Sequence, residues 1–243
     1  MGLASTPGII DDFVTFLSGT VISTASAAGI KLLQSTDGGT AFVEGTVPGL
    51  AAGANAATDN HMEELSFDRL MLRAQEGEIG FEVRAKVSVA TTLALNIGLN
   101  DDALEDSNTL PVELSGTTWT TNSATFIGVC YDVDSTNDDV HMMWVDDDND
   151  STQALADLRM TGVNPAAGEF FKAGVQVTDA GSGNQCPARA WFETAGGKYG
   201  EKAFKATIDR DAAMVGYTGW ENRDAVAHTI SIQYMHQWAS LAI

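Results

Sequence analysis

Residues 78–102, with the sequence EIGFEVRAKVSVATTLALNIGLNDD, constrain the fold more than any other stretch of this chain. In residues 81–87 the apolar side chains occupy one parity and the charged side chains occupy the other. A strand with one buried face and one solvated face has this period of two. Residues 90–92 predict a turn, and residues 93–99 then repeat the alternation. Two such strands in succession predict an antiparallel sheet whose apolar face is covered by a second layer.

Similar alternation continues through the rest of the chain. Further strands are predicted at residues 124–131, 140–145, 170–177, 188–193, 204–208, 214–217 and 229–238. The last of these is predicted to place Ile230, Ile232, Tyr234, His236 and Trp238 on one face. Short strands joined by acidic or glycine-rich connections are typical of a sandwich or jelly roll. The sequence therefore predicts an all-β protein built as an antiparallel β-sandwich.

The first part of the chain differs in composition. Residues 1–60 are rich in Gly, Ala, Ser and Thr and contain a single basic residue, Lys31. Such a segment has little apolar surface with which to form a core of its own. We expect residues 1–60 to form an N-terminal arm or edge hairpin ordered by a neighbouring subunit, or a surface segment that crosses the sandwich. Residues 61–243 are expected to form the sandwich domain.

The charge of the chain limits its partners. Its 13 basic and 33 acidic residues give a net charge of −20, and residues 87–158 contain no Lys or Arg. Nucleic acid and anionic membranes would repel such a chain, so neither is an expected partner. No apolar run approaches the length of about 18 residues that a membrane span requires, and residues 1–12 do not resemble a secretion signal. We therefore expect synthesis in a cytoplasm.

An acidic run is the best candidate for a metal site. Asp146, Asp148 and Asp150 occupy alternate positions, and Asp157 follows eleven positions after the first of them. Calcium loops use oxygen ligands with a similar spacing. However, Ser151 stands where such a loop needs glycine, and Asp157 stands where it needs glutamate. A solvated turn is the alternative interpretation, with Ca²⁺ as the only cofactor that the pattern suggests.

The remaining polar residues do not form a catalytic motif. The chain lacks the G-x-S-x-G nucleophile motif and the paired carboxylates of sandwich-type glycosidases, so a non-enzymatic protein is expected. Cys130 and Cys186 are its only cysteines, and their redox state is left open. Five tryptophans could form core or stack on sugar rings. We expect Trp220 to lie in a loop and, with Asn222 and Arg223, to contact a ligand or a subunit.

Several of these segments resemble a known family. FEVRAKVS followed by LNIGLNDD is similar to a strand pair of concanavalin-like jelly-roll proteins encoded among tailed-phage virion genes. The order of the later segments FIGV (residues 126–129) and FKAGV (residues 171–175), and of the closing strand, is similar too. The resemblance covers roughly residues 65–243 and rests on core-strand patterns.

The resemblance implies a structural role on a bacteriophage virion. The implied function is a capsid decoration (cement) protein that binds the major capsid protein and copies of itself, with a trimer as the first choice of oligomer. Its location would be the capsid surface, after synthesis in the bacterial host cytoplasm. The alternative is a carbohydrate-binding, lectin-like module on the virion surface or on a fibre, for which glycans are the partner.

Overall fold

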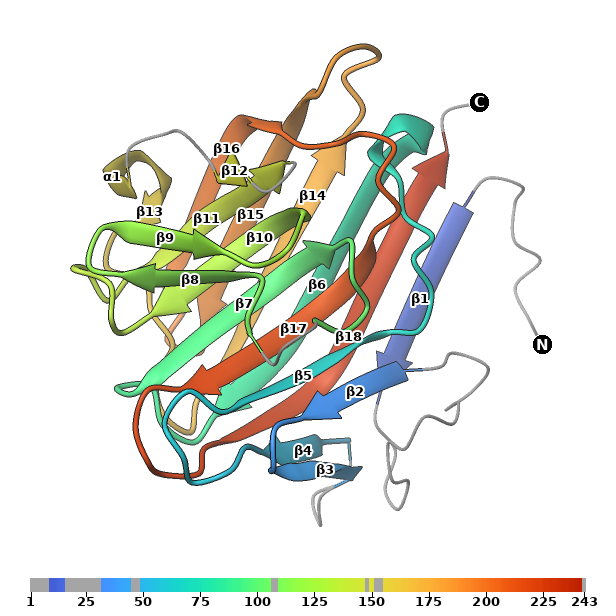
Figure 1. Cartoon of the computed structure of the whole chain (residues 1–243). Coiled ribbons are helices and arrows are strands. Elements are labelled where there is room, and N and C mark those ends of the chain that lie inside the picture. Colours follow the sequence, from blue (N-terminus) through green and yellow to red (C-terminus); the bar gives the residue numbers. More distant parts are fainter. Residues whose placement is uncertain are drawn as a thin grey trace.

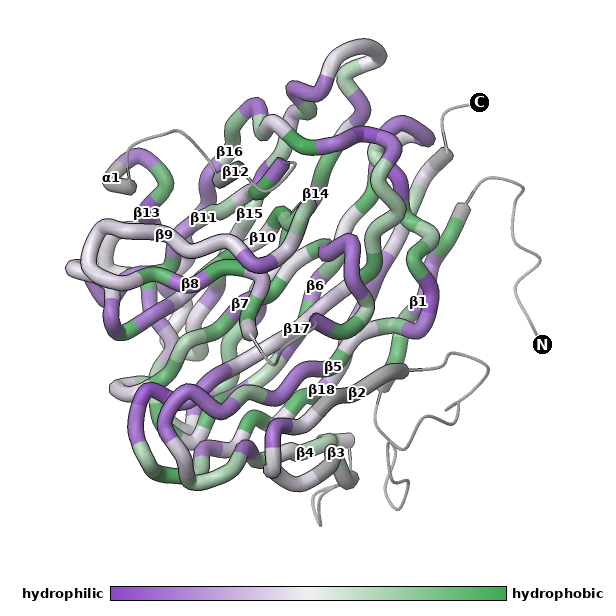
Figure 2. Tube along the Cα trace, viewed as in Figure 1, coloured by the Kyte–Doolittle hydropathy of each residue, from purple (hydrophilic) through white to green (hydrophobic). Residues whose placement is uncertain are grey.

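The computed structural model describes residues 9–15, 32–44, 49–105, 109–146, 149–150 and 155–241. Two eight-stranded antiparallel sheets pack face to face and enclose the hydrophobic core (Figure 1). Hydrophobic segments run along the strands of both sheets (Figure 2). The prediction of an all-β antiparallel sandwich is confirmed, and each strand predicted between residues 124 and 238 overlaps an observed strand. None of the helices in the described part of the chain has the length and apolar character needed to cross a membrane.

The sheet that lies behind in Figure 1 is called the back sheet. Its strand order is β16-β15-β14-β6-β18-β4-β3, and β1 pairs with the second half of β18. Its strands are β1 (Ile9–Thr15), β3 (Thr40–Glu44), β4 (Ala51–Ala54), β6 (Gly77–Val87), β14 (Phe170–Thr178), β15 (Gln185–Thr194), β16 (Tyr199–Thr207) and β18 (Thr229–Leu241).

The sheet nearer the viewer is called the front sheet. Its strand order is β12-β11-β10-β7-β17-β5-β2, and β13 pairs with β11. Its strands are β2 (Leu32–Thr36), β5 (Met62–Phe67), β7 (Leu93–Asn100), β10 (Thr125–Asp132), β11 (Val140–Asp146), β12 (Asn149–Asp150), β13 (Arg159–Met160) and β17 (Val215–Asn222). A hairpin of β8 (Val112–Ser115) and β9 (Thr118–Thr121), the 3-10 turn η1 (Ala74–Glu76) and the helix α1 (Leu155–Leu158) complete the chain.

The two strands of residues 78–102 lie in different layers. The sequence predicted β6 and β7 as neighbours in one sheet, but β6 pairs with β14 and β18, whereas β7 pairs with β10 and β17. The turn at residues 88–92 therefore carries the chain from one sheet to the other. The apolar parities of the two strands meet across the core instead of side by side, which explains why both alternate so regularly.

The front sheet is buried on both of its faces along its centre. All residues of β7 and β10 are buried, although only alternate residues face the core. The β8–β9 hairpin covers the outer face, where Val112 and Leu114 pack against Phe126, Met143 and Tyr217. Apolar side chains therefore exclude solvent from both faces of these strands. Beneath this hairpin the front sheet has little exposed surface.

The described parts of residues 1–60 belong to the same sandwich. The strands β1 and β4 pair with β18, and β2 pairs with β5. Phe42 of β3 is fully buried, and its ring packs edge to face against Trp220 at 5.2 Å. These strands therefore add edge strands to both sheets, while the division of the chain at residue 60 stays a prediction.

Both cysteines are free and buried. Cys130 lies in β10 of the front sheet, and Cys186 lies in β15 of the back sheet. Burial raises the pKa of each thiol, so both are kept in the protonated, unreactive form.

Candidate functional site

Only part of the predicted calcium site lies within the described residues. Asp146 ends β11 and Asp157 lies exposed in α1, while Asp148 and the side chain of Asp150 lie outside the described residues. Within the described residues no three His, Cys, Asp or Glu side chains are placed to hold a metal ion. Calcium binding by this run therefore stays a prediction.

The predicted loop at Trp220 is wrong. Trp220 lies in β17, and its side chain is fully buried in the core between the sheets. The polar sequence after the tryptophan suggested a loop. Instead, residues 218–222 continue the strand, in which Thr218 and Gly219 pair with both β5 and β7. A buried indole presents no surface to a ligand.

Asn222 holds two loops together at the end of β17. Its side-chain oxygen accepts a hydrogen bond from the backbone N–H of His61 at 3.0 Å. Its side-chain nitrogen lies within hydrogen-bond distance of the carbonyl oxygens of Ala56, Thr58 and Asp224. The amide is buried and fully used by these bonds, which gives Asn222 a structural role.

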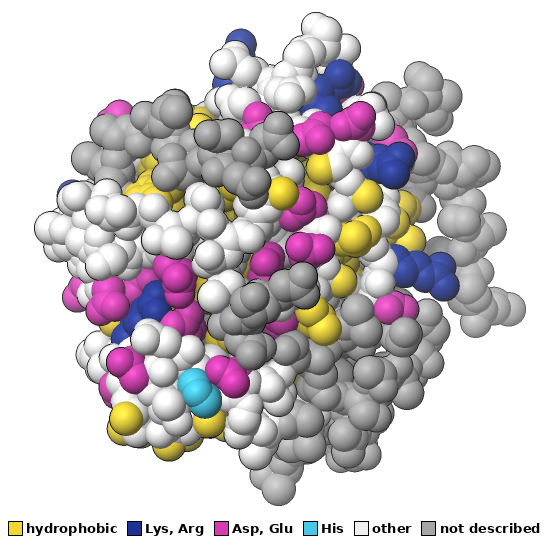
Figure 3. Space-filling view, in the orientation of Figure 1, with side chains coloured by type: hydrophobic (Ala, Val, Ile, Leu, Met, Phe, Trp, Pro, Cys, Tyr) yellow, Lys and Arg dark blue, Asp and Glu magenta, His cyan; other side chains and the backbone are white. Residues whose placement is uncertain are grey.

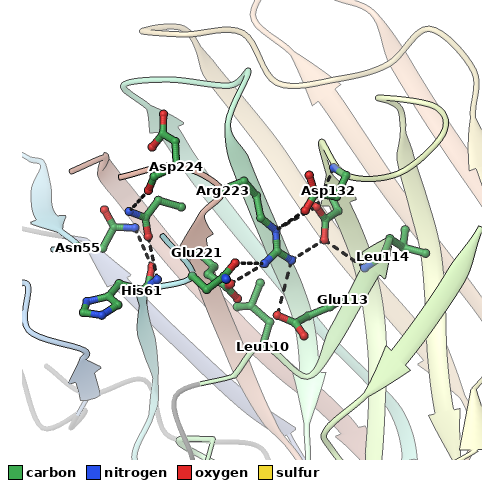
Figure 4. A network of polar contacts seen from close by, with 12 residues as sticks. Asn55, His61, Leu110, Glu113, Leu114, Asp132, Glu221, Arg223 and Asp224 are labelled. Atoms are coloured by element: carbon green, nitrogen blue, oxygen red, sulfur yellow. Dashed lines mark hydrogen bonds and ion pairs between the residues drawn. The ribbon is translucent and has the colours of Figure 1, made fainter. Parts of the chain in front are cut away.

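Arg223 lies in a buried network of charges. Its guanidinium donates to both carboxylate oxygens of Asp132, at 3.2 and 2.7 Å, and to Glu221, and it lies 3.5 Å from Glu113 (Figure 4). Burial acts to lower the pKa of Arg223, but the hydrogen bond and charge of Asp132 outweigh it and raise that pKa. Burial also raises the pKa of Glu221, to about 8, against the opposing charge of Arg223. Because the carboxylates bound by this guanidinium come from β10, β17 and the β8–β9 hairpin, the network connects these three elements.

Further buried acids lie on the front sheet. Glu105 accepts a hydrogen bond from Asn100 and its backbone N–H donates to Glu64 at 3.0 Å. Figure 3 shows Asp and Glu side chains across the middle of this side of the molecule, with basic side chains among them. The acids Glu64, Glu105 and Glu221 of this side are therefore buried and bonded to neighbouring groups of the protein.

The outer face of the back sheet is different, and a β-bulge creates the difference. The register of β18 on β6 shifts between Ile232 and Tyr234, which leaves Gln233 as an extra residue. Before the bulge Ile230 and Ile232 face the core. An extra residue in a strand exchanges the two faces beyond it.

The prediction that one face of this strand carries both isoleucines and its aromatic residues is therefore wrong. Met235 and Ala239 are buried, while Tyr234, His236 and Trp238 are half-buried on the outer face. The bulge turns three aromatic side chains away from the core and toward solvent.

Two indole rings lie flat on the outer face of the back sheet. Gly80 of β6 lies beneath Trp238, and a Cβ atom there would stand 2.1 Å from Cζ2 of that ring. Gly174 of β14 lies beneath Trp191 in the same way, at 2.4 Å from Cζ2. The two ring centroids are 6.5 Å apart, with an angle of 32° between the planes. Each glycine gives an indole room to lie against the backbone, so one face of each ring is turned outward.

Glu82 fixes the rings that surround it. Its two carboxylate oxygens accept hydrogen bonds from Nε1 of Trp191 at 3.2 Å and from the hydroxyl of Tyr234 at 2.5 Å. The guanidinium of Arg189 lies 5.4 Å from the centre of the Trp191 ring. A carboxylate that holds two aromatic side chains at once keeps their orientation constant without a bound ligand.

The strand β1 extends this surface. Phe13 is 50% exposed, and its ring stacks on Tyr234 at 5.3 Å and meets His236 edge to face at 5.5 Å. Nε2 of His236 lies 2.8 Å from a carboxylate oxygen of Asp11. We call Phe13, Trp191, Tyr234, His236 and Trp238 the aromatic surface.

The sequence contained one signal for this surface. Trp191 shares its parity in β15 with Arg189 and Glu193, whereas Ala190 and Phe192 occupy the other parity. That arrangement places Trp191 on the solvated face. For β18 the sequence gives no such signal, because the residue type at the bulge, Gln233, does not distinguish a bulge from a regular strand position.

Comparison with known proteins gives matches to structures alone. No family model and no curated protein matches the sequence. Peanut lectin, solved with a nine-residue peptide, matches with a TM-score of 0.59 and 11% identity over 97% of this chain and 99% of the lectin. The potassium-bound carbohydrate recognition domain of Emp46p matches with a TM-score of 0.54 and 12% identity, over 87% of this chain and 89% of that domain.

A protein of unknown function from Shewanella oneidensis MR-1 also matches, with a TM-score of 0.54 and 13% identity over 99% of this chain and 90% of that protein. The fold is a concanavalin-like jelly roll. This part of the sequence resemblance is confirmed, and it is the fold of lectins. The virion role, the partners and the absence of catalysis stay predictions.

Proposed function

We propose that this protein binds carbohydrate and that the aromatic surface of the back sheet is the binding site. The observation that carries the proposal is the pair of indoles, Trp191 and Trp238, held flat over glycines with one face outward. An ordinary core tryptophan is enclosed on all sides, as Trp220 is. Here the backbone beneath the rings is shaped to let them lie parallel to the sheet.

The chemistry of such a surface suits a sugar. The ring of a pyranose has C–H groups on its faces, which pack against an aromatic ring, and hydroxyls at its edge, which need polar partners. Gln176, Arg189 and Asp11 stand in the same cross-strand row as Trp238, and Glu82 stands beside Trp191 in the next row. Apolar and polar groups therefore alternate over the surface, as both faces and edges of a sugar require.

The extent of the surface favours an oligosaccharide. The registers place Phe13, His236, Glu82, Gly174, Trp191 and Glu201 opposite one another on six successive strands. Neighbouring strands are about 4.8 Å apart, so this row is about 24 Å long. We infer that the site follows several sugar units of a chain.

The fold supports the proposal only in general terms. Two of the similar structures are described as a lectin and as a carbohydrate recognition domain, but their identities to this chain are 11% and 12%. The residues of the aromatic surface carry the argument here. The front sheet is a weaker candidate because the β8–β9 hairpin covers its outer face and its polar groups bond to one another.

Glycan-array binding with two alanine variants tests the proposal. Trp191→Ala and Trp238→Ala should each weaken binding at least about tenfold, which corresponds to about 1.4 kcal/mol. Trp119→Ala is the matched control, because Trp119 is a partly exposed tryptophan on the β8–β9 hairpin, which covers the other sheet. Absence of glycan binding by the unchanged protein, or an equal loss in the control, would contradict the proposal.

The sequence resemblance adds a location for this activity. A glycan-binding module on a virion surface or a fibre is the form of the proposal that agrees with it. Capsid decoration is the alternative function, and only the sequence resemblance supports it. Adding the purified protein to particles that lack it distinguishes them: decoration predicts saturable binding to the major capsid shell that Trp238→Ala leaves unchanged.

A further inference from the structure

We propose that the glycan is anionic and that a hollow beside the aromatic surface binds one of its carboxylates. The inference rests on the proposed function and names the chemical class of the sugar. The hollow has a volume of about 550 Å³ and lies on the outer face of the back sheet. Its lining includes Arg84, Phe170, Lys172, Glu193, Gln233 and Tyr234. Because Tyr234 belongs to both, the hollow and the aromatic surface are continuous.

Arg84 is the central group of the hollow. It lies opposite Tyr234 on one side and opposite Lys172 on the other, in the row next to Glu82. Its guanidinium lies over the ring of Phe170, with Cζ 4.5 Å from the ring centre. Its Nη1 donates a hydrogen bond to the side-chain oxygen of Gln233. The bulge residue thus orients the cation, just as the bulge itself orients the aromatic rings.

The charge of Arg84 is not neutralised by the described part of the protein. No carboxylate there forms an ion pair with it; its recorded contacts are a neutral amide and an aromatic ring. Arg223, by contrast, contacts four carboxylates at 4.0 Å or less. A partly buried guanidinium with unused N–H groups is suited to an anionic ligand.

The other charges around the hollow leave it net positive. Nζ of Lys86 lies 5.3 Å from the centre of the Phe170 ring, which the guanidinium of Arg84 also contacts. Glu193 is the acidic group that lines the hollow, and Nζ of Lys172 pairs with it at 3.4 Å. The nearby Glu82 uses its two oxygens to bind Trp191 and Tyr234. The three cations Arg84, Lys86 and Lys172 therefore outnumber the two carboxylates of Glu82 and Glu193, and Arg84 and Lys86 form no ion pair among the described residues.

The positions of the basic residues fit the same interpretation. Five of the 13 lie on the outward parity of β6, β14, β15 and β16, namely Arg84, Lys86, Lys172, Arg189 and Lys205. The planar fork of a guanidinium matches a carboxylate in a bidentate geometry. A uronic acid presents such a carboxylate on a ring whose faces can stack on Trp191 or Trp238. The geometry therefore points to a polysaccharide that contains uronic acids.

Calorimetric titration with a matched pair of sugars tests this inference. The probes are an oligogalacturonate and the same oligosaccharide with its carboxylates reduced to neutral alcohols. The charged probe should bind at least about tenfold more tightly than the neutral one, with an advantage that declines as salt rises. Arg84→Gln should remove this advantage and leave binding of the neutral probe unchanged. Lys205→Gln, on the edge strand β16 outside the hollow, is the control and should keep the advantage.

Each alternative result has a distinct meaning. Equal binding of both probes would overturn the inference and leave the proposed function standing. Binding of neither probe, together with no signal on the glycan array, would overturn both. Tighter binding of a sulfated glycan than of the oligogalacturonate would overturn the assignment of a carboxylate. An unchanged melting temperature of Arg84→Gln shows that lost discrimination is not caused by unfolding.

Discussion

The two sheets use polar and aromatic residues in opposite ways. On the front sheet, Arg223 and its carboxylates are buried, bonded to one another and covered by the β8–β9 hairpin. On the back sheet, Trp191 and Trp238 are half-buried and lie flat over glycines, with Arg189 beside the first ring and His236 beside the second. Buried charge therefore joins strands in the front sheet, whereas the back sheet presents aromatic rings on its outer face, where we propose that a glycan binds.

Breaking the Arg223 network should have the largest effect on stability. Arg223→Met leaves Asp132 and Glu221 buried without their cation, and losing one partner of a buried pair costs about 3–5 kcal/mol. For a chain of this size the melting temperature should fall by about 6–20 °C. Arg189→Met is the control, because Arg189 is an exposed residue of the back sheet. Its free energy of unfolding, measured in the same thermal experiment, should change by less than about 0.5 kcal/mol. Equal effects of the two variants would remove the contrast between the sheets.

Disturbing the floor of the aromatic surface should mainly affect binding. In Gly80→Ala the new Cβ occupies space that Trp238 fills, so the indole must tilt away from the sheet. We expect glycan affinity to fall about tenfold, close to the effect of Trp238→Ala, as measured by titration calorimetry. Gly196→Ala, in a turn where a Cβ meets nothing closer than 3.9 Å, is the matched control. Undiminished binding by Gly80→Ala would show that the flat ring is not required.

Buried acids of the front sheet should make stability depend on pH. Burial raises the pKa of Glu63 to about 9 and that of Glu105 to about 8, so the folded protein holds protons that the unfolded chain releases above about 4.5. The free energy of unfolding should therefore fall as pH rises from about 5 to 9, by up to about 1.4 kcal/mol per pH unit for each such group.

Replacing Glu63 by a neutral residue tests this dependence. Glu63→Gln should make the curve of unfolding free energy against pH less steep over this range, because one titrating group is removed. Denaturant unfolding at several pH values measures the slope, with Glu76→Gln, an exposed site, as the control. The same slope in both variants would contradict the assignment.

The smallest effect is expected in the acidic run near α1. Asp157 is exposed, so Asp157→Ala should change the free energy of unfolding by less than about 0.5 kcal/mol in the presence of a chelator. If the run of Asp146, Asp148, Asp150 and Asp157 binds calcium, adding Ca²⁺ should raise the melting temperature of the unchanged protein, and Asp157→Ala should reduce that rise. No shift on adding Ca²⁺ would remove the calcium prediction.

Alternation in the sequence was sufficient to predict the fold class. The period of two reports which residues of one strand share a face, and it located most strands correctly. It does not report which sheet a strand joins, because β6 and β7 would alternate identically as neighbours or across the core. It also fails where both faces are buried, as at Trp220, because the polar neighbours Glu221 and Asn222 are buried too, the first bonded to Arg223 and the second to residues 56–61.

The candidate site was harder to predict than the fold. Trp220, Asn222 and Arg223 combined an aromatic ring with polar groups, which is the composition of a binding site, but their partners come from distant segments such as residues 56–61 and Asp132. The aromatic surface needs five strands in register, two glycines beneath two rings and one bulge. None of these relations is local in sequence, so no single segment could reveal them.

The bulge in β18 also has a genetic consequence. Removing the codon for Gln233 would keep the reading frame but exchange inside and outside for the remainder of the strand, moving Met235 outward and the aromatic residues inward. Conversely, inserting one codon into a regular strand exchanges the side chains that face the core and those that face solvent beyond it, with no change in their identity. Sequence comparisons that place no gap here would equate core positions of one protein with surface positions of another.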